Sequence, residues 1–404
     1  MMFNLSKPRY LDGDLQQGFV SLYSGKTISG IAISLFGVFM PIYLYKVSDN
    51  NFTFVALYFL IGYLLYGLLA PFGAMALNRL GYRRALQISV LFGAASFIVF
   101  YPMDRSNMMF LAPLSILIVL IYRLLFWLPY NVDFAKFTDR RNRGREVGLT
   151  NAIADIVGIA APVVAAFIIV RFGFGALLVF TTIVYLASLI PYAVIPNIGE
   201  HFGWNYGQTI RQLFSKKRRA TALAFAANGA EDALGAVVWP IFIYQLLQGN
   251  LMKVGFISTL IIGATILLEL IVGKYSDVKF SKETIIKYGS MLAALGWVFK
   301  IFIFTAFQIF IVDSYHRLMK IFMMVPFDAL SYEIMADQGH YIDEFSVLHD
   351  MAISLGRVVM VGAIVIAAMF VSIQWTFIFG AITSLSLNLL RGQQPITTIR
   401  PTMT

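Results

Sequence analysis

The chain has 404 residues, of which 59% are hydrophobic and only 13% are charged, and its formal net charge is +10. Soluble globular proteins carry about 25% charged residues, so this composition excludes an ordinary water-facing surface and indicates a protein embedded in lipid. Cysteine is absent, which excludes disulfides, thiolate metal sites and a cysteine nucleophile. The basic residues lie in short alternate loops, which indicates membrane topology and not a nucleic acid-binding surface.

Twelve apolar runs follow one another, and each is long enough for a membrane helix, which needs roughly 20 residues. The runs cover residues 19–45, 53–77, 85–102, 108–133, 147–170, 175–195, 220–247, 252–275, 285–306, 309–335, 345–370 and 374–390. We therefore predict an all-α membrane protein with twelve transmembrane helices in two six-helix bundles. The predicted parts are an N-terminal bundle (1–196), a cytoplasmic basic linker (197–219) and a C-terminal bundle with a short cytoplasmic tail (220–404).

Basic residues gather in the connections on one side of the predicted helices. Of the 31 Lys and Arg residues, 21 fall in connections on this side and 4 in connections on the other. Loops rich in Lys and Arg stay on the cytoplasmic side of a membrane. We therefore predict a multi-pass protein of the plasma (inner) membrane with both termini in the cytoplasm.

The first and seventh runs repeat one pattern at an offset of 199 residues. The shared positions are Gly30, Leu35, Val38, Pro41, Ile42 and Tyr45 in the first run and Gly229, Leu234, Val237, Pro240, Ile241 and Tyr244 in the seventh. Such a repeat predicts two pseudo-symmetric halves in parallel orientation.

A polar turn with small and basic residues joins the second and third runs, and a related segment follows the eighth run at about the same offset. The positions that carry the pattern are Ala74, Asn78, Arg79, Gly81, Arg83 and Arg84 in the first half and Gly273 and Asp277 in the second. The pair resembles the cytoplasmic gating signature of the major facilitator superfamily. Two departures are Ala74 in place of the leading glycine and Asn78 in place of aspartate. The resemblance implies a twelve-helix secondary transporter in which helices 1, 4, 7 and 10 line a central cavity.

Charged side chains inside the apolar runs are the main functional signal. A charge near the bilayer centre costs at least about 2.5–3.5 kcal/mol, so it needs a partner, water or a function. The candidates for substrate binding or proton coupling are Lys26, Arg123, Asp155, Glu231, Asp232, His316, Arg317, Lys320 and Arg357. Most of them fall on the cavity-lining runs of the family that the chain resembles. The aromatic residues expected in the same cavity are Tyr43, Trp127, Tyr130, Trp239 and Tyr244.

Glu231 and Asp232 are the strongest candidates, because the seventh run places them roughly 16–18 Å from its start, near the midplane of a ~30 Å hydrocarbon core. Two adjacent acids there cannot both be ionised cheaply. Either one pairs with a base across the cavity, such as Arg317, Lys320 or Arg357, or one holds a proton at neutral pH. A carboxyl that holds a proton and faces each side in turn is what proton coupling requires.

The remaining charges can also serve purely structural roles. Arg123 is equally well interpreted as an ion-pair partner of Asp133 or Asp155. Asp313 is expected to form a water-exposed ion pair with Arg317, near the outer end of its run. Lys300 is expected to extend toward the membrane interface with its charge in water.

These features predict a secondary active transporter of a small organic solute that works by alternating access and is coupled to a proton or another ion. Gly158 and Pro162, among small residues of the fifth run, resemble a superfamily antiporter motif, and Arg123 is similar to the buried arginine of a second such motif, which favours export. Close helix packing accounts for the same small residues equally well. The alternatives are an uptake symporter for an organic anion and a membrane protein without transport activity.

No enzyme activity, cofactor or metal is predicted, because the sequence contains no nucleotide-binding loop and no metal-binding motif. The expected partners are a small-molecule solute, a coupling ion and the lipid bilayer. No nucleic acid is expected, and the chain is expected to be a monomer.

Overall fold

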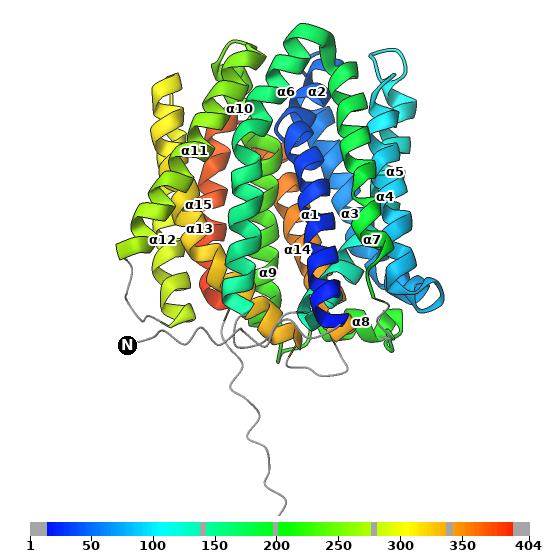
Figure 1. Cartoon of the computed structure of the whole chain (residues 1–404). Helices are drawn as coiled ribbons and strands as arrows, with labels where there is room; N and C mark the ends of the chain where they lie inside the picture. The colour runs from blue at the N-terminus through cyan, green and yellow to red at the C-terminus, as the bar shows by residue number, and fades with distance from the viewer. Residues whose placement is uncertain (1–13, 138–142, 197–200, 276–280, 337–341, 391–404) are drawn as a thin grey trace, which may run out of the picture.

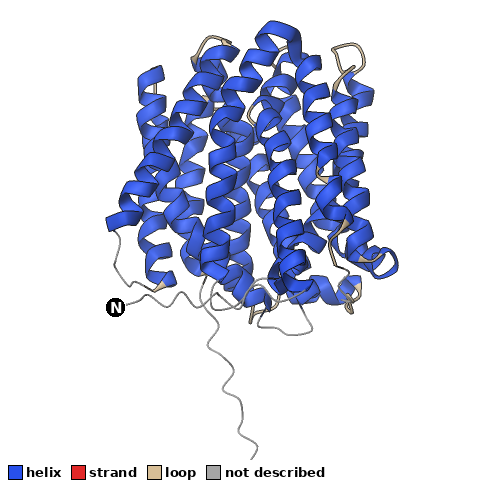
Figure 2. Ribbon diagram, viewed as in Figure 1, coloured by secondary structure: helices blue, strands red, loops and turns tan. Residues whose placement is uncertain are grey.

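The computed structural model describes residues 14–137, 143–196, 201–275, 281–336 and 342–390. Side chains of helix residues 14–17, 135–137, 143–157, 269–275, 335–336 and 342 lie outside this description. The described chain is helical and contains no strand (Figure 2). The helices run side by side between two ends of one bundle, with the short helix α8 at one end (Figure 1). We call this the α8 end and the other the opposite end.

The first half of the chain forms the helices of the first six predicted runs. They are α1 (Asp14–Gly37), α2 (Phe39–Val47), α3 (Phe52–Leu80), α4 (Tyr82–Phe100), α5 (Met108–Phe137), α6 (Arg143–Ala187) and α7 (Leu189–Ala193). Together α1 and α2 form the first run. The long α6 holds the fifth run and most of the sixth, and it is kinked at Gly173, whose φ of 86° interrupts the helical backbone. Only glycine adopts such a φ at little cost.

The second half begins within the predicted linker, which contains a short helix, α8 (Tyr206–Leu213). The remaining elements are α9 (Arg219–Ala233), the π-helical turn η2 (Leu234–Val238), α10 (Trp239–Leu246), α11 (Leu251–Tyr275), α12 (Lys282–Ile301), α13 (Ala306–Ala336), α14 (Ile342–Ala367), η4 (Ile373–Thr376), α15 (Phe377–Ser386) and η5 (Leu387–Leu389). The seventh run is therefore α9, η2 and α10 in succession, and the twelfth is η4, α15 and η5.

Seven helical stretches of the described chain are long and apolar enough, by length and composition, to cross a membrane. One of them, Gly158–Ala193, contains two of the predicted runs. The remaining runs do not meet these limits of length and composition. The helices α12 and α13 carry several charged residues, η2 divides the seventh run, and the twelfth run is short. The twelve predicted runs thus coincide with the helices, although their boundaries shift by a few residues.

Two helix pairs join the halves along their length: α3 packs on α14, and α6 packs on α11. The second contact is close, because a Cβ atom on Gly255 would overlap Ala166 and the carbonyl of Pro162. The Val163 N–H donates to the Thr259 hydroxyl at 3.2 Å in the same interface. Pro162 and Ala166 of the fifth run therefore serve close helix packing.

Large apolar side chains cover the outside of the bundle. Phe110, Phe172, Phe307 and Phe370 are each more than 60% exposed. Exposed apolar surface of this extent indicates contact with another apolar phase. With helices of membrane-spanning length, this phase is the lipid hydrocarbon.

Candidate functional site

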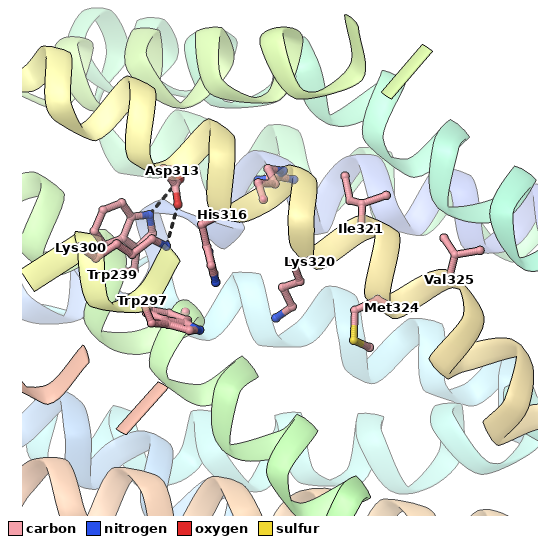
Figure 3. A pocket seen from close by; sticks show the side chains of 11 residues that line it. Trp239, Trp297, Lys300, Asp313, His316, Lys320, Ile321, Met324 and Val325 are labelled. Atoms are coloured by element: carbon pink, nitrogen blue, oxygen red, sulfur yellow. Dashed lines mark hydrogen bonds and ion pairs between the residues drawn. The ribbon is translucent and has the colours of Figure 1, made fainter. Parts of the chain in front are cut away.

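A cavity of about 390 Å³ lies within the C-terminal half, between η2, α10, α12 and α13 (Figure 3). Its lining residues are Gly235, Trp239, Trp297, Lys300, Asp313, His316, Arg317, Lys320, Ile321, Met324 and Val325. The polar members from α13 recur every three or four residues, which places them on one face of this helix.

Lys300 and Asp313 form a buried ion pair at one end of the cavity. The Lys300 Nζ lies 2.7 Å from Asp313 Oδ1 and 4.0 and 4.3 Å from the ring centroids of Trp239 and Trp297. The Trp239 Nε1–H donates to Asp313 Oδ2 at 3.1 Å. The expectation that Lys300 extends to the interface is therefore wrong, since its side chain is 2% exposed. Asp313, on α13, therefore pairs with Lys300, on α12, whereas the sequence favoured Arg317 as its partner.

Glu231 lies behind the cavity wall and is completely buried. It occupies the last turn of α9, directly before η2. Its Oε2 accepts a hydrogen bond of 3.1 Å from the Ser384 hydroxyl, and its Oε1 lies 3.5 Å from Lys320 Nζ and 3.8 Å from His316 Nε2. The carboxyl therefore reaches the cavity only past two of its lining residues, His316 and Lys320.

Asp232, the neighbouring acid, is on the accessible side of the same network. Its Oδ1 lies 3.1 Å from Lys320 Nζ, and its Oδ2 lies 3.6 Å from Arg357 Nη2. Its side chain is 37% exposed, against 0% for Glu231. Lys320 thus interacts with two acids, of which Asp232 also lies near Arg357 and Glu231 also lies near His316.

His316 packs its ring edge-on to Trp297, with 4.5 Å between the ring centroids. Figure 3 shows the side chains of His316 and Lys320 projecting from α13 toward the same space. The structure therefore brings together five of the predicted site residues: Glu231, Asp232, His316, Lys320 and Arg357. Arg317 lines the same cavity.

The N-terminal candidates lie among aromatic rings. The Lys26 Nζ is 4.2 Å from the ring centroid of Trp127, 4.9 Å from that of Tyr130 and 5.2 Å from that of Phe126. Such cation–π contacts partly replace hydration of the ammonium group. Asp155 lies in α6, but its side chain is outside the described part.

Arg123 contacts Tyr63 of α3, with 5.3 Å between the guanidinium carbon and the ring centroid. Arg357 lies over the same ring at 5.2 Å. In the part of the chain that the structure describes, Arg123 forms no ion pair. Of its two predicted partners, Asp133 is therefore wrong, and the Asp155 side chain lies outside the described residues.

Of the expected cavity aromatics, Trp239 lines the cavity, whereas Tyr43 belongs to the core of the N-terminal half. The Tyr43 hydroxyl donates to the carbonyls of Phe100 and Met103 at 2.6 and 2.8 Å. Trp127 and Tyr130 surround Lys26, and Tyr244 lies at the opposite end of the bundle against Tyr45.

The gating signature forms the turn between α3 and α4 at the α8 end. The residues Ala74, Asn78 and Arg79 belong to α3, and Arg83 and Arg84 begin α4. Gly81 joins the two helices with a φ of 75°. The Arg83 side chain donates to the Ala193 carbonyl. Gly273 lies in α11, and Asp277 lies outside the described residues.

Asn78, which stands in place of the aspartate of the family signature, has a structural role. Its Nδ2 donates to the Phe202 carbonyl at 2.9 Å, and its Oδ1 accepts from the Phe202 N–H at 2.9 Å. An aspartate could accept but could not donate, so only the amide satisfies both groups. This pair fixes the end of α3 to the segment that precedes α8.

Sequence reasoning missed Ser384, Trp297 and Tyr63. Trp297 and Lys300 are three residues apart, so helical spacing could have placed them on one face. Ser384 is one of several polar residues in an otherwise apolar run, which was a usable but weak signal. Tyr63 has no distinguishing signal in the sequence.

Comparisons with known proteins agree with this architecture. The sequence profile described as Major Facilitator Superfamily matches residues 22–341. A single-residue variant of the E. coli fucose:proton symporter FucP has a similar crystal structure, with a TM-score of 0.64 and 12% identity, covering 93% of this chain and 98% of that one. FucP in the outward conformation is also similar, with a TM-score of 0.62, 13% identity and coverage of 92% and 97%. No curated protein matches the sequence.

The chain belongs to the Major Facilitator Superfamily and is an integral, multi-pass membrane protein. It is a secondary transporter of this family, whose members are generally not enzymes. The predicted all-α membrane fold is thereby confirmed.

Proposed function

We propose that the chain moves a small organic solute by alternating access of the cavity to the two sides of the membrane, and that a proton carried by Glu231 drives the cycle. The observation that carries the proposal is the contact of a completely buried Glu231 with Lys320, which Asp232 also contacts. A buried carboxylate is unfavourable unless it is paired. Protonation of Glu231 would release Lys320 to Asp232 or to a solute, so that proton binding changes the charge presented to the cavity.

Reconstitution of the purified chain in proteoliposomes tests the proposal. A panel of organic solutes is applied under an imposed pH gradient, and an entrapped pH indicator reports proton movement with each solute. We expect wild-type protein to accumulate at least one solute with proton movement. Glu231→Gln should lose gradient-driven accumulation and keep solute exchange at equal pH, because the amide cannot carry the proton.

Glu333→Gln is the matched control, because Glu333 pairs with Lys282 (2.5 Å) away from the cavity and should leave accumulation unchanged. Gradient-driven accumulation by Glu231→Gln at the wild-type rate would refute the role of Glu231. Absence of flux for every solute would favour a membrane protein without transport activity.

For the arrangement in the membrane, we propose that both termini lie on the cytoplasmic side of the plasma membrane. Residues 1–196 and 220–404 would move relative to each other as two six-helix bundles, connected by 197–219. The excess of Lys and Arg on one side supports this orientation. The chain would act as a monomer.

Export was favoured by the antiporter-like Gly158 and Pro162. The packing of Gly255 against Pro162 and Ala166 supports a structural role for Pro162, whereas no atom lies within 4 Å of a Cβ built on Gly158. The cationic lining of the cavity, with Arg317 and Lys320, favours the second candidate, uptake of an organic anion. Reversing the pH gradient in the same liposomes distinguishes the two, since a symporter moves solute with the proton and an antiporter moves it against the proton.

A further inference from the structure

Cations from both halves of the molecule meet around one tyrosine. The guanidinium carbons of Arg123, from α5, and Arg357, from α14, lie 5.3 and 5.2 Å from the ring centroid of Tyr63. The two guanidinium groups are therefore separated by at most about twice this distance. Arg357 has an acidic partner in Asp232, whereas Arg123 has none in the described part of the chain. Because a charge inside a membrane protein needs a partner, the charge of Arg123 beside this ring favours a further anion near it.

The ion pairs of Asp232 are accessible, in contrast to those of Glu231. The side chains of Asp232, Lys320 and Arg357 are 37%, 26% and 24% exposed. A dissolved carboxylate could therefore reach the two cations without unfolding of the site. Guanidinium groups bind carboxylates with paired, charge-assisted hydrogen bonds, so Arg357 suits this exchange chemically.

Beside these cations, the cavity offers room for an apolar group. Met324, one turn beyond Lys320, projects to the same side of α13 as Lys320, and Ile321 and Val325, which project to the other side of this helix, also belong to the cavity lining (Figure 3). Its volume of about 390 Å³ exceeds what a carboxylate alone would need. Trp297 Nε1 and His316 Nε2 are buried without a hydrogen-bond partner, so two polar atoms of the wall are also unsatisfied. A ligand with an acceptor oxygen on its body would satisfy the Trp297 donor.

We propose that the substrate is an organic carboxylate with an apolar body, and that Asp232 occupies the place of its carboxylate when the site is empty. The substrate carboxylate replaces Asp232 on Lys320 and Arg357 and contacts Arg123 from the other half. The apolar body enters the cavity along Met324. This inference rests on the proposed transport function, because it names the solute class of the same site.

Binding to the purified full-length chain in detergent tests the inference without any flux. The probes are benzoate and 2-naphthoate, each compared with its neutral amide, benzamide and 2-naphthamide. We expect the acids to raise the melting temperature and to bind at least about tenfold more tightly than the amides, since only the acids carry the charge that the cations require. Equal binding of acid and amide would overturn the inference, and so would the absence of binding by both acids.

Substitutions then test the role of the Asp232 carboxylate and the roles of the cations separately. Asp232→Asn should bind the acids about tenfold more tightly, because it no longer competes for Lys320 and Arg357. Arg123→Gln and Lys320→Gln should each weaken acid binding about tenfold and leave amide binding unchanged. Asp49→Asn is the matched control, since Asp49 forms an exposed pair with Arg105 and contacts none of the residues of this site.

Weaker acid binding by Asp232→Asn than by wild type would overturn the role of Asp232. If this variant does not fold, the wild-type comparison of acid with amide and the Arg123→Gln variant still decide the substrate class. The outcome is distinguishable from failure of the proposed function. Proton-coupled flux of uncharged solutes together with no binding of acids would overturn this inference alone, and acid binding without proton movement would overturn only the proposed coupling.

Discussion

Lys300 is a charged side chain buried within the C-terminal half, and one acidic side chain, Asp313, compensates its charge. Its ammonium group contacts Asp313 at 2.7 Å between two tryptophan rings. Removing one member of such a pair leaves an uncompensated buried charge, which typically costs about 3–5 kcal/mol. We therefore expect Lys300→Met to lower the free energy of unfolding by about this amount, measured by denaturant titration in detergent.

Two further variants make this prediction specific. Lys300→Met combined with Asp313→Asn should recover most of the loss, because the second change removes the unpaired charge and keeps an acceptor for Trp239. Lys282→Met is the control, since its pair with Glu333 is partly exposed and such pairs contribute about 0–1 kcal/mol. If Lys300→Met alone is as stable as wild type, Lys300 and Asp313 do not form a buried ion pair.

The position of Lys300 shows which properties of a single residue can be predicted from the sequence. The sequence shows that Lys300 is charged and lies in a membrane-spanning run, but it does not show in which direction the side chain extends. A lysine three residues from Trp297 extends outward or inward according to the neighbours that α10 and α13 bring to it. Glu231 and Lys320 were predictable, because a charge near mid-span needs a partner wherever it points.

At the scale of helices, the crossing of α9 and α14 depends on two glycines. A Cβ atom on Gly356 would overlap the Ala226 carbonyl, and one on Gly229 would overlap the Ile353 carbonyl. Overpacking of this kind typically costs about 1–3 kcal/mol, and backbone atoms have little freedom to move away. We expect Gly356→Ala to lower the stability by about this amount, seen as a lower melting temperature in detergent.

Gly263→Ala is the matched control within the same half. No atom lies within 4 Å of a Cβ built on Gly263 in α11, and alanine is the better helix former by about 1 kcal/mol. This variant should be as stable as wild type or slightly more so. If both alanine variants melt alike, α9 and α14 do not pack as closely as the structure indicates.

The helices themselves were largely predictable, because apolar runs of membrane-spanning length seldom occur outside membrane helices. Their interruptions were harder to predict. The non-helical backbone at Gly173 separates the fifth and sixth runs within α6. The π-helical turn η2 interrupts the seventh run two residues before Pro240, which is a usable signal for this interruption. The helix α8 was also missed, since its eight residues lie in a segment that was interpreted as a linker. Such features depend on packing between helices far apart in the sequence.

For the whole molecule, contacts between the halves occur at both ends of the bundle. At the opposite end, Gln245 donates to the Tyr45 hydroxyl at 2.8 Å, and the rings of Tyr45 and Tyr244 meet edge-on. These tyrosines are the repeat-related pair of the sequence. At the α8 end, the Tyr82 hydroxyl bonds to Asp343 and joins α4 to α14. In the alternating-access cycle that we propose, one of these two sets of contacts separates to open each side of the molecule.

The absence of cysteine from the sequence allows a direct test, because an introduced pair is then the only thiol pair. We expect the pair Tyr45→Cys with Gln245→Cys, linked by a short bifunctional thiol reagent, to abolish solute flux in proteoliposomes. The pair Tyr82→Cys with Asp343→Cys should do the same at the other end, since alternating access requires each end to open in turn. A reagent with a cleavable disulfide should allow flux to return on reduction.

The matched control is Asp104→Cys with Asn107→Cys, which links two residues of one exposed turn at the opposite end within the N-terminal half. Linking this pair constrains no movement between the halves, so flux should persist. Unchanged flux with either inter-half pair fully linked would mean that this end need not open. Loss of flux in the control would show damage by the reagent itself. Blocked flux in both inter-half pairs and normal flux in the control is the pattern expected if the two halves move relative to each other during transport.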